Sequence, residues 1–467
     1  MTTQQQEVPE FKRGLIVAVL ISGAFVAILN QTLLATALPH IMSDLSLDNT
    51  TVQWLQTIFL LVNGIMIPIT AFLIGSFSTR KLFLTAIALF GIGTLICAIA
   101  PNFAFLLVGR IIQASGAGII MPLMQTIFFA IFPIEKRGAA MGMFGLVIAF
   151  APAIGPTLSG WIVTNHSWRV LFYIVLPIAI LDFIFAFFIL KNVTKLTYPK
   201  LDVLSILLST IGFGGLLYGF STAGSKGWSD IEVIATLIVG AIALILFIVR
   251  QLKLEQPILE FRVFKYGVFA LTTAIGMIVF LVMISGATIL PLYMQDMLGY
   301  SPLKSGLMLL PGAIVMGVMS PITGRIFDKI GAKWLALIGL IIATVTTFTF
   351  THLTANTSYT YLATMWAIRM FGISMVMMPV TTAGLNQLPQ RLIPHGSAMN
   401  NTMRQVAGSI GTALMFTIMA NTALDVKTHG MQGVIHGVNI AFFVAACICI
   451  IGILLSFFIR KTRPTAQ

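Results

Sequence analysis

GLIVAVLISGAFVAILNQTLLATALP, residues 14–39, begins as a long apolar run and then places three polar side chains side by side. An apolar run of about 20 residues is long enough to span the hydrocarbon core of a bilayer as a helix. Asn30, Gln31 and Thr32 interrupt the run, and polar groups at that depth are tolerated only inside protein or beside a water-filled cavity. The stretch predicts a membrane helix whose polar side chains face the interior of a helical bundle.

The composition of the whole chain also indicates a membrane protein. Of its 467 residues, 58% are hydrophobic and 9% are charged, and the mean hydropathy is +0.99. A soluble domain carries about 25% charged residues, so this chain lacks the residues for a water-facing surface. Cys97, Cys447 and Cys449 fall in apolar runs and are interpreted as reduced core residues. We predict an all-α polytopic membrane protein.

Fourteen apolar runs are long enough to cross a bilayer. With the N-terminus placed in the cytoplasm, 20 of the 27 Lys and Arg residues fall in loops on that side and 3 fall on the other. Since positively charged loops stay cytoplasmic, both termini are predicted to be cytoplasmic, and the net charge of +13 reflects topology rather than nucleic-acid binding. The runs lie at roughly 14–37, 53–74, 81–99, 103–131, 138–164, 168–190, 202–224, 232–253, 267–293, 303–325, 333–352, 359–385, 396–422 and 434–459.

The runs form a six-two-six arrangement, because the longest polar links on the cytoplasmic side, 191–201 and 254–266, bracket the seventh and eighth runs. The two blocks of six resemble each other, since Pro68–Thr70 and Pro321–Thr323 both read PIT near the end of the second run. We predict a duplication with a substrate path near the membrane midplane, between the two repeats. The predicted units are a tail at 1–13, a six-helix half at 14–190, two additional helices with their links at 191–266, a second six-helix half at 267–460 and a tail at 461–467.

A polar, glycine-containing stretch, GRIFDKIGAK at residues 324–333, lies between the second and third runs of the second half. With the six-two-six plan, it resembles the fourteen-helix drug:proton antiporter branch of the major facilitator superfamily over essentially the whole chain. The first half departs from the family's loop pattern, because Gly75 stands at the position of the aspartate. The resemblance implies an inner-loop gate formed by Gly324, Asp328, Lys329, Gly331 and Lys333, with Arg80 from the first half.

The fifth run contains VIAFAPAIGPTLSG, residues 147–160, which is similar to the antiporter motif of that family. Gly155, Pro156 and Gly160 match the motif. Small residues let two helix backbones approach closely, and a proline inside a helix removes a hydrogen bond and bends it. Ordinary helix packing is the alternative interpretation, and the Gly-Pro pair in the fifth helix favours the antiporter motif.

Ionisable residues inside the bilayer are candidates for proton coupling, because they are expensive to keep there. Arg110 lies in the fourth run with Gln113 on the same helical face, and this stretch resembles the family's fourth-helix motif, whose arginine is implicated in proton coupling. A structural arginine that ties helices together through carbonyl groups is the alternative.

Two carboxylates are further candidates for carrying the proton. Asp182 lies deep in the sixth run among apolar neighbours, and Asp296 lies at the outer mouth of the ninth. Burial disfavours the charged form of Asp182, so this residue suits reversible protonation better. The alternatives are an interhelical hydrogen bond for Asp182 and an ordinary loop acid for Asp296.

Polar residues in the runs are candidates for lining a substrate cavity. The family usually has an acid where this chain has Asn30, and an amide cannot titrate near neutral pH. This residue is therefore expected to be a neutral hydrogen-bonding group, which leaves proton coupling to the carboxylates. The full set of cavity candidates is Asn30, Gln31, Thr32, Gln113, Arg369, Arg404 and Gln405.

The chain shows no Cys/His/carboxylate cluster with metal-ligand spacing and no glycine-rich phosphate loop, so we expect no metal, no cofactor and no enzymatic activity. We predict a monomeric, proton-coupled antiporter of the bacterial inner membrane that exports hydrophobic or cationic drug-like compounds. Export of a single physiological metabolite or lipid is one alternative, and a non-transporting membrane sensor or scaffold is another. The charges kept at membrane depth favour transport over a scaffold.

Overall fold

The computed structural model describes residues 10–460, and in that part of the chain all regular secondary structure is helical. The parts of the predicted tails at 1–9 and 461–467 lie outside the described residues. The long helices are α1 (Glu10–Asp44), α2 (Asn49–Ser76), α3 (Thr79–Ala98), α4 (Phe103–Ile131), α5 (Arg137–Asn165), α6 (Arg169–Ile189), α7 (Val203–Lys226), α8 (Ile231–Lys253), α9 (Gly267–Leu292), α10 (Pro302–Ile330), α11 (Ala332–Thr349), α12 (Tyr359–Leu385), α13 (Ile393–Thr422) and α14 (Val426–Phe457).

Every predicted run corresponds to one of these helices, and several of the helix ends follow local capping chemistry. Asp48 and Asn102 accept hydrogen bonds from backbone N–H groups in the first turns of α2 and α4. At the C-terminal end of α10, Gly331 has a φ of 82°, a left-handed conformation that glycine adopts without steric penalty. The α14 helix is interrupted at Gly430, whose φ is 56°.

Thirteen of the described helices are long and apolar enough to cross a membrane, and α13 is the long helix that does not meet this condition. The thirteenth apolar run, predicted at 396–422, is therefore not confirmed as a membrane crossing. The physical reason is the polar group Asn400, Asn401, Arg404 and Gln405, which falls within two turns of the helix and lowers its hydropathy. The α13 helix is nevertheless surrounded by protein, since it packs against α2, α4, α7, α9 and α14.

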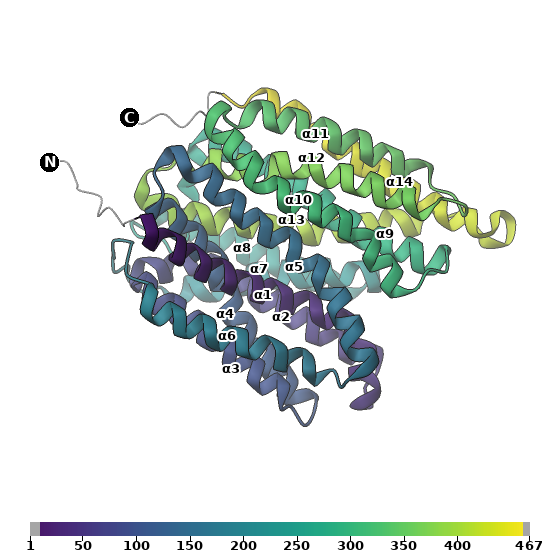
Figure 1. Cartoon of the computed structure of the whole chain (residues 1–467), viewed down its shortest axis with the longest axis horizontal. Helices are drawn as coiled ribbons and strands as arrows, with labels where there is room; N and C mark the ends of the chain where they lie inside the picture. Colours follow the sequence, from purple (N-terminus) through teal and green to yellow (C-terminus); the bar gives the residue numbers. More distant parts are fainter. Residues whose placement is uncertain (1–9, 461–467) are drawn as a thin grey trace.

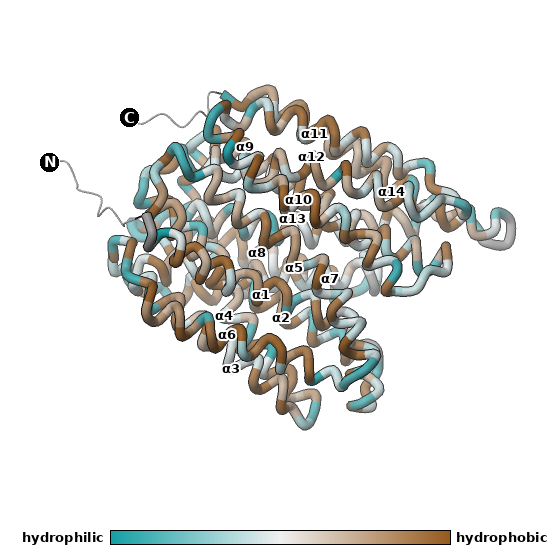
Figure 2. The backbone as a smooth tube through the Cα atoms, viewed as in Figure 1, coloured by the Kyte–Doolittle hydropathy of each residue, from teal (hydrophilic) through white to brown (hydrophobic). Residues whose placement is uncertain are grey.

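The helices run roughly side by side, and the two ends of the described chain, residues 10 and 460, lie at the same end of the bundle (Figure 1). We call this end the terminal end and the opposite one the distal end. Hydrophobic residues follow the middle of the helices, whereas hydrophilic residues gather in the loops at the two ends (Figure 2). This distribution is what a bilayer-spanning bundle requires. Of the three free cysteines, Cys97 and Cys449 are buried and Cys447 is half-buried.

Close helix packing depends on small residues at the crossing points. The α5 and α10 helices pack against each other, and an ideal Cβ at Gly142 would lie 2.5 Å from the carbonyl oxygen of Ser320. A Cβ at Gly93 would lie 2.6 Å from the oxygen of Gly109, which shows the same close approach between α3 and α4. These contacts place the backbones of neighbouring helices in van der Waals contact.

The α7–α8 pair joins helices that are distant in sequence. Near the distal end, Tyr218 of α7 stacks on Trp54 of α2 with ring centroids 5.5 Å apart, and the Trp228 Nε1 donates to Oγ1 of Thr417 in α13 at 2.5 Å. At the terminal end, two hydrogen bonds from the Arg250 guanidinium, at 2.7 and 3.1 Å, lower the pKa of Asp202 to about 2. The Asp202 carboxylate is thus ionised at neutral pH and ties the start of α7 to the end of α8.

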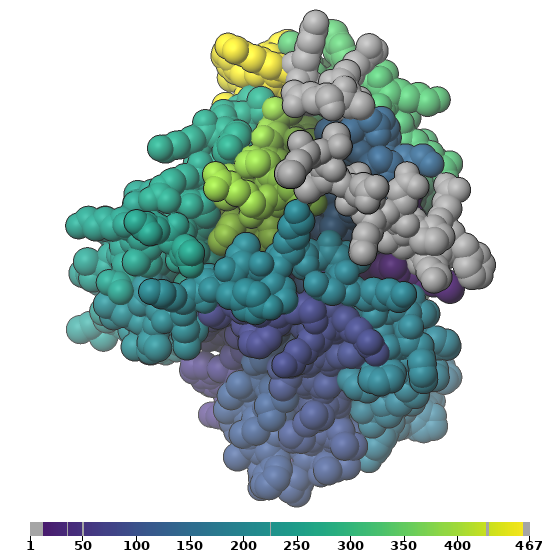
Figure 3. Space-filling model, turned by 90° about the vertical axis from the view of Figure 1, so that its left-hand side faces the viewer, coloured from purple at the N-terminus to yellow at the C-terminus, as the bar shows by residue number. Residues whose placement is uncertain are grey.

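The segment between α6 and α7 lies across the turn between α2 and α3. The backbone N–H groups of Thr197 and Tyr198 donate to the carbonyl oxygen of Gly75 at 3.0 and 3.2 Å, and Thr79 Oγ1 donates to Lys191 O at 3.2 Å. Figure 3 views the terminal end, where the teal link covers part of the blue-purple α2–α3 region. The link therefore occupies the surface beside Gly75, where the family pattern has its aspartate.

Candidate functional site

The Asp328 carboxylate caps the N-terminus of α5 at the terminal end of the bundle. Its two oxygens accept hydrogen bonds from the backbone N–H groups of Gly138 and Ala139 at 2.8 and 2.9 Å. The first N–H groups of a helix have no partner within the helix and carry partial positive charge, so an anion is stabilised there. Because Asp328 belongs to α10, this contact fastens α10 to α5.

Two glycines make this contact possible. A Cβ at Gly324 would overlap the carbonyl oxygen of Gly138, and a Cβ at Gly138 would overlap both Gly324 O and the Asp328 carboxylate. The α5 and α10 backbones therefore meet directly where the carboxylate reaches the helix end. Gly331 ends α10 directly after this turn, in the left-handed conformation described above.

Further polar contacts at the terminal end join helices of the first half, α4 and α5, to helices of the second half, α12 and α13. Arg137 donates to the side-chain oxygen of Asn386, at the end of α12, at 3.0 Å and to Phe129 O of α4 at 2.8 Å. The Gln125 side-chain oxygen in α4 accepts from Ser397 Oγ at 2.6 Å and from Asn401 Nδ2 at 2.9 Å, both in α13. We call these contacts the terminal latch, which consists of Asp328, Gly138, Ala139, Arg137, Asn386, Gln125, Ser397 and Asn401.

Of the latch residues, only Asp328 is predicted from the sequence. Arg137 directly precedes the fifth predicted run, and its role depends on packing that brings α5 and α12 together. One sequence signal was available, because Gly138, Gly142 and Gly145 recur at the spacing of a close helix contact. Gln125 and Ser397 carry no local signal, since their partners lie more than 270 residues away.

The remaining gate candidates lie outside the latch contacts. Lys329 is exposed and Lys333 is half-buried at the same end of the molecule. Arg80 at the start of α3 donates to the carbonyl oxygen of Phe187 in α6 at 2.6 Å, and its guanidinium lies 4.8 Å from the ring centroid of Phe187. Arg80 is thus placed between α3 and α6 rather than against α10 or α13.

Arg110 and Gln113 lie together in the buried interior, as their spacing predicted. Arg110 Nε donates to Leu55 O of α2 at 3.1 Å, and Nη1 donates to the side-chain oxygen of Gln113 at 2.8 Å. Gln113 in turn donates to Thr94 Oγ1 of α3 at 2.7 Å, and the guanidinium lies 4.1 Å from the ring centroid of Phe59. This geometry matches the alternative in which the arginine ties helices together.

Arg369 has a comparable set of partners in α9 and α11. Its Nε donates to Thr347 Oγ1 at 3.1 Å and its Nη2 to Val282 O at 2.6 Å. Arg404 in α13 is also buried and donates to Thr381 Oγ1 of α12. All three arginines retain one guanidinium nitrogen that is buried without a hydrogen-bond partner among the described residues: Arg110 Nη2, Arg369 Nη1 and Arg404 Nε.

The stretch at 147–160, which resembles the family's antiporter motif, lies directly against the polar cluster of α1. Thr32 Oγ1 donates to Leu29 O at 2.9 Å and contacts Ala151 O of α5 at 3.4 Å. A Cβ at Gly155 would overlap Thr32 Oγ1 and would lie 2.8 Å from Thr32 Cβ, whereas a Cβ at Gly160 would have no atom within 4 Å among the described residues. Gly155 is therefore needed for the α1–α5 contact, and Gly160 is not.

We predict that Gly155→Ala lowers the stability of the protein by about 1–3 kcal/mol, because it adds volume to a packed crossing. A thermal unfolding scan of the purified variant measures this loss. Gly160→Ala is the matched control in the same motif and is expected to unfold like wild type. Adding Thr32→Ala to Gly155→Ala is expected to recover part of the loss, and no recovery would contradict the assigned contact.

Asp182 lies on the buried stripe of α6, which continues through Val175, Ala179 and Ala186. The carboxylate faces α1, where Ser22 is its hydrogen-bond partner and an ideal Cβ at Gly23 would lie 2.7 Å from Oδ2. The residue is 3% exposed, and Oδ2 has no hydrogen-bond partner among the described residues. Asp182 is thus a buried acid held between two helices, with partners different from those of Arg110.

The other polar candidates are placed as follows. Asn30 is 2% exposed, and its Nδ2 is buried without a partner in the described chain, while Gln31 is half-buried. Gln405 is half-buried on α13, and an ideal Cβ at Gly64 of α2 would lie 3.7 Å from its Cγ. Asp296 is exposed in a short π-helix, Tyr293–Met297, that follows α9, which agrees with the interpretation as a loop acid.

The family model described as Major Facilitator Superfamily matches residues 20–412, which is most of the chain and includes the latch, the arginines and the antiporter motif. The chain belongs to the major facilitator superfamily. The family resemblance predicted from the loop motif is confirmed. Major facilitator superfamily proteins are transporters and not enzymes, and the chain is accordingly a multi-pass membrane transporter.

Relatives and solved structures agree with this assignment. The chain is 57% identical to the uncharacterized MFS-type transporter YcnB of Bacillus subtilis (strain 168), covering 100% of this chain and 99% of that protein. It is 45% identical to the lincomycin resistance protein LmrB of the same organism, covering 96% of each chain. The structure of the major facilitator superfamily proton:xylose symporter XylE superimposes with a TM-score of 0.68 at 13% identity, covering 98% of both chains, which supports the fold.

Proposed function

We propose that the protein is a proton-coupled antiporter that exports hydrophobic or cationic drug-like compounds by alternating access. The observation that carries this proposal is the terminal latch, because Asp328 and its neighbours close one end of the bundle with contacts that must break when that end opens. A carboxylate on a helix N-terminus is a bistable element of the kind that alternating access needs. The similarity to the lincomycin resistance protein supports export of a drug-like compound.

We assign the proton-binding role to Asp182. Its burial and its unpartnered oxygen favour a neutral acid when the surroundings are dry, and opening toward water would favour the anion. Because the carboxylate packs on Gly23 of α1, a change in its charge would act on the helix that carries Asn30 and Thr32. Arg110 is the further candidate, while the exposed position of Asp296 gives that residue no comparable support.

The proposed layout has fourteen membrane crossings, with α13 crossing inside the protein and both termini in the cytoplasm. The proposed working unit is a monomer.

Matching contacts support two repeats at 14–190 and 267–460. Thr70 of α2 donates to Gly118 O at 3.4 Å, and Thr323, 253 positions later, donates to Ser374 O of α12 at 3.0 Å. An ideal Cβ at Gly372 would lie 2.6 Å from Gly339 O, which parallels the Gly93–Gly109 contact.

Purified protein in liposomes tests the proposal. Under an imposed pH gradient, adding a transported compound such as lincomycin is expected to accelerate proton movement across the membrane. A panel of hydrophobic and cationic compounds measures the range, and a resistance profile of an expressing strain identifies which compounds to include. Absence of substrate-dependent proton flux for the whole panel would contradict the proposal. Proton flux with only one compound class would favour an exporter of a single metabolite or lipid. The charged residues at membrane depth argue against a non-transporting sensor or scaffold, because such a protein has no need to keep them there.

A further inference from the structure

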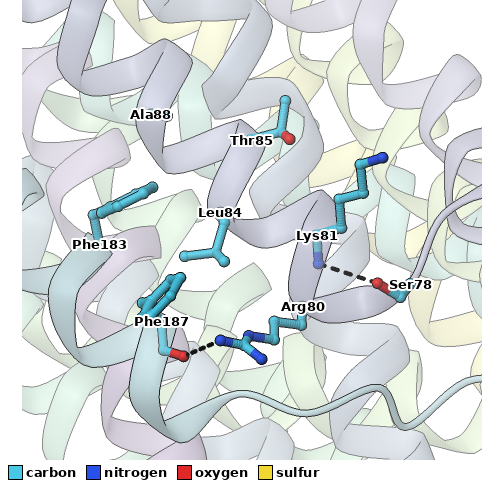
Figure 4. A pocket seen from close by; sticks show the side chains of 8 residues that line it. All are labelled: Ser78, Arg80, Lys81, Leu84, Thr85, Ala88, Phe183 and Phe187. Atoms are coloured by element: carbon cyan, nitrogen blue, oxygen red, sulfur yellow. Dashed lines mark hydrogen bonds between the residues drawn. The ribbon is translucent and has the colours of Figure 1, made fainter.

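A groove of about 390 Å³ lies between α3 and α6, away from the terminal latch. Apolar side chains, Leu84, Phe183 and Phe187, line one side of the groove, and the Arg80 and Lys81 side chains border it in different directions (Figure 4). The groove faces outward from the bundle, since the neighbouring α6 side chains Ile184, Phe185 and Phe188 are 44–77% exposed. The lining residues are Ser78, Arg80, Lys81, Leu84, Thr85, Ala88, Phe183 and Phe187.

Arg80 is the basic residue of the groove whose side chain is held by a hydrogen bond. Arg80 is held over the Phe187 ring by its hydrogen bond to the Phe187 carbonyl oxygen, as Figure 4 shows. Lys81 is the next residue of α3, and its ammonium lies 5.5 Å from the ring centroid of Phe77. Lys191 is brought beside the start of α3 by the hydrogen bond from Thr79.

The two described segments that carry these charges supply no carboxylate to neutralise them. The sequences of α3 and of the link at 191–201 contain no Asp or Glu. The groove therefore presents net positive charge at the terminal end of a membrane helix pair, with apolar walls that extend toward the bilayer centre. A phosphate group at the level of Arg80 and Lys81, joined to hydrocarbon at the level of Ala88 and Phe183, complements this surface.

We infer that the groove binds an anionic membrane phospholipid, with its phosphodiester on Arg80 and Lys81 and an acyl chain along Leu84, Ala88 and Phe183. Basic pockets between membrane helices bind lipid head groups of this kind, and a guanidinium recognises phosphate through several donors at once. The assignment also accounts for the placement of Arg80. The residue matches the family's gate loop in sequence, yet it lies on the lipid-facing side of α3. The site does not depend on which compound the protein exports.

Native mass spectrometry of the full-length protein tests the lipid site. Wild type is expected to retain phosphatidylglycerol in preference to phosphatidylcholine of the same chain length. Lys81→Gln is expected to lower that preference about fivefold, and Arg80→Gln with Lys81→Gln by about thirtyfold at low salt. The matched control, Lys253→Gln with Lys265→Gln, removes two exposed charges at the same end of the bundle and is expected to behave like wild type.

A second variant tests the apolar part without changing charge. Ala88→Phe places a ring in the groove and is expected to reduce phosphatidylglycerol retention, while thermal unfolding reports that the variant remains folded. Glycerol phosphate, which has the head group without acyl chains, is expected not to displace the lipid. The inference is overturned if wild type does not discriminate between phosphatidylglycerol and phosphatidylcholine. It is also overturned if the Arg80→Gln, Lys81→Gln variant retains phosphatidylglycerol like wild type, or if glycerol phosphate displaces the bound lipid.

Discussion

Asp182→Asn is expected to reduce substrate-driven proton flux in liposomes to the level of protein-free vesicles. The amide has nearly the same shape as the acid, so the contact with Gly23 and the hydrogen bond with Ser22 can persist. It cannot bind and release a proton, however, and proton coupling requires a group that does. Substrate binding by the purified variant is expected to remain, because the carboxylate contacts Ser22 and Gly23 of α1, about two helical turns from the nearest cavity candidate, Asn30.

Asp296→Asn is the matched control, since it makes the same chemical change at an exposed position. This variant is expected to keep wild-type proton flux. Thermal unfolding of both variants separates a loss of coupling from a loss of folding. Full proton-coupled transport by a correctly folded Asp182→Asn protein would show that Asp182 only packs between the helices, and Arg110 would then be the next residue to replace.

Asp328→Ala is expected to open the terminal end of the bundle. The substitution removes both backbone hydrogen bonds to α5, and a hydrogen bond to a charged group contributes about 1.5–3 kcal/mol. Loss of even one such bond shifts the balance between the closed and open forms roughly ten- to hundredfold toward the open form. Distances between spin labels on introduced cysteines at 136 and 329 measure this shift directly.

The control for this experiment is Asp202→Ala, which breaks an ion pair at the same end of the molecule but within the α7–α8 pair. It is expected to leave the distance between the labels unchanged. An unchanged distance distribution in Asp328→Ala would mean that Arg137, Gln125 and the close glycine packing hold the end closed without the carboxylate.

The sequence was sufficient for the helices, because hydropathy acts locally and each run carries its own signal. The exception is α13, a helix whose own hydropathy does not indicate a membrane crossing. The α13 helix is held by contacts with helices of both halves, so its polar residues are compatible with the bundle although its own hydropathy is low. Asp328 was also predictable, from a motif within ten residues. Its partner, the start of α5, was not, since the contact joins residues 190 positions apart through two glycines.

The polar character of α13 has a consequence for how the chain enters the membrane during synthesis. An arginine at the centre of an isolated helix costs about 2.5–3.5 kcal/mol on insertion, and Arg404 is accompanied by two asparagines and a glutamine. A segment of this kind is expected to partition poorly into lipid by itself, and in the proposed fourteen-crossing layout it would leave the insertion machinery together with helices that accept its polar face. Biogenesis of the second half is therefore expected to be cooperative, with α13 depending on α9 beforehand and on α14 afterwards to reach its final depth.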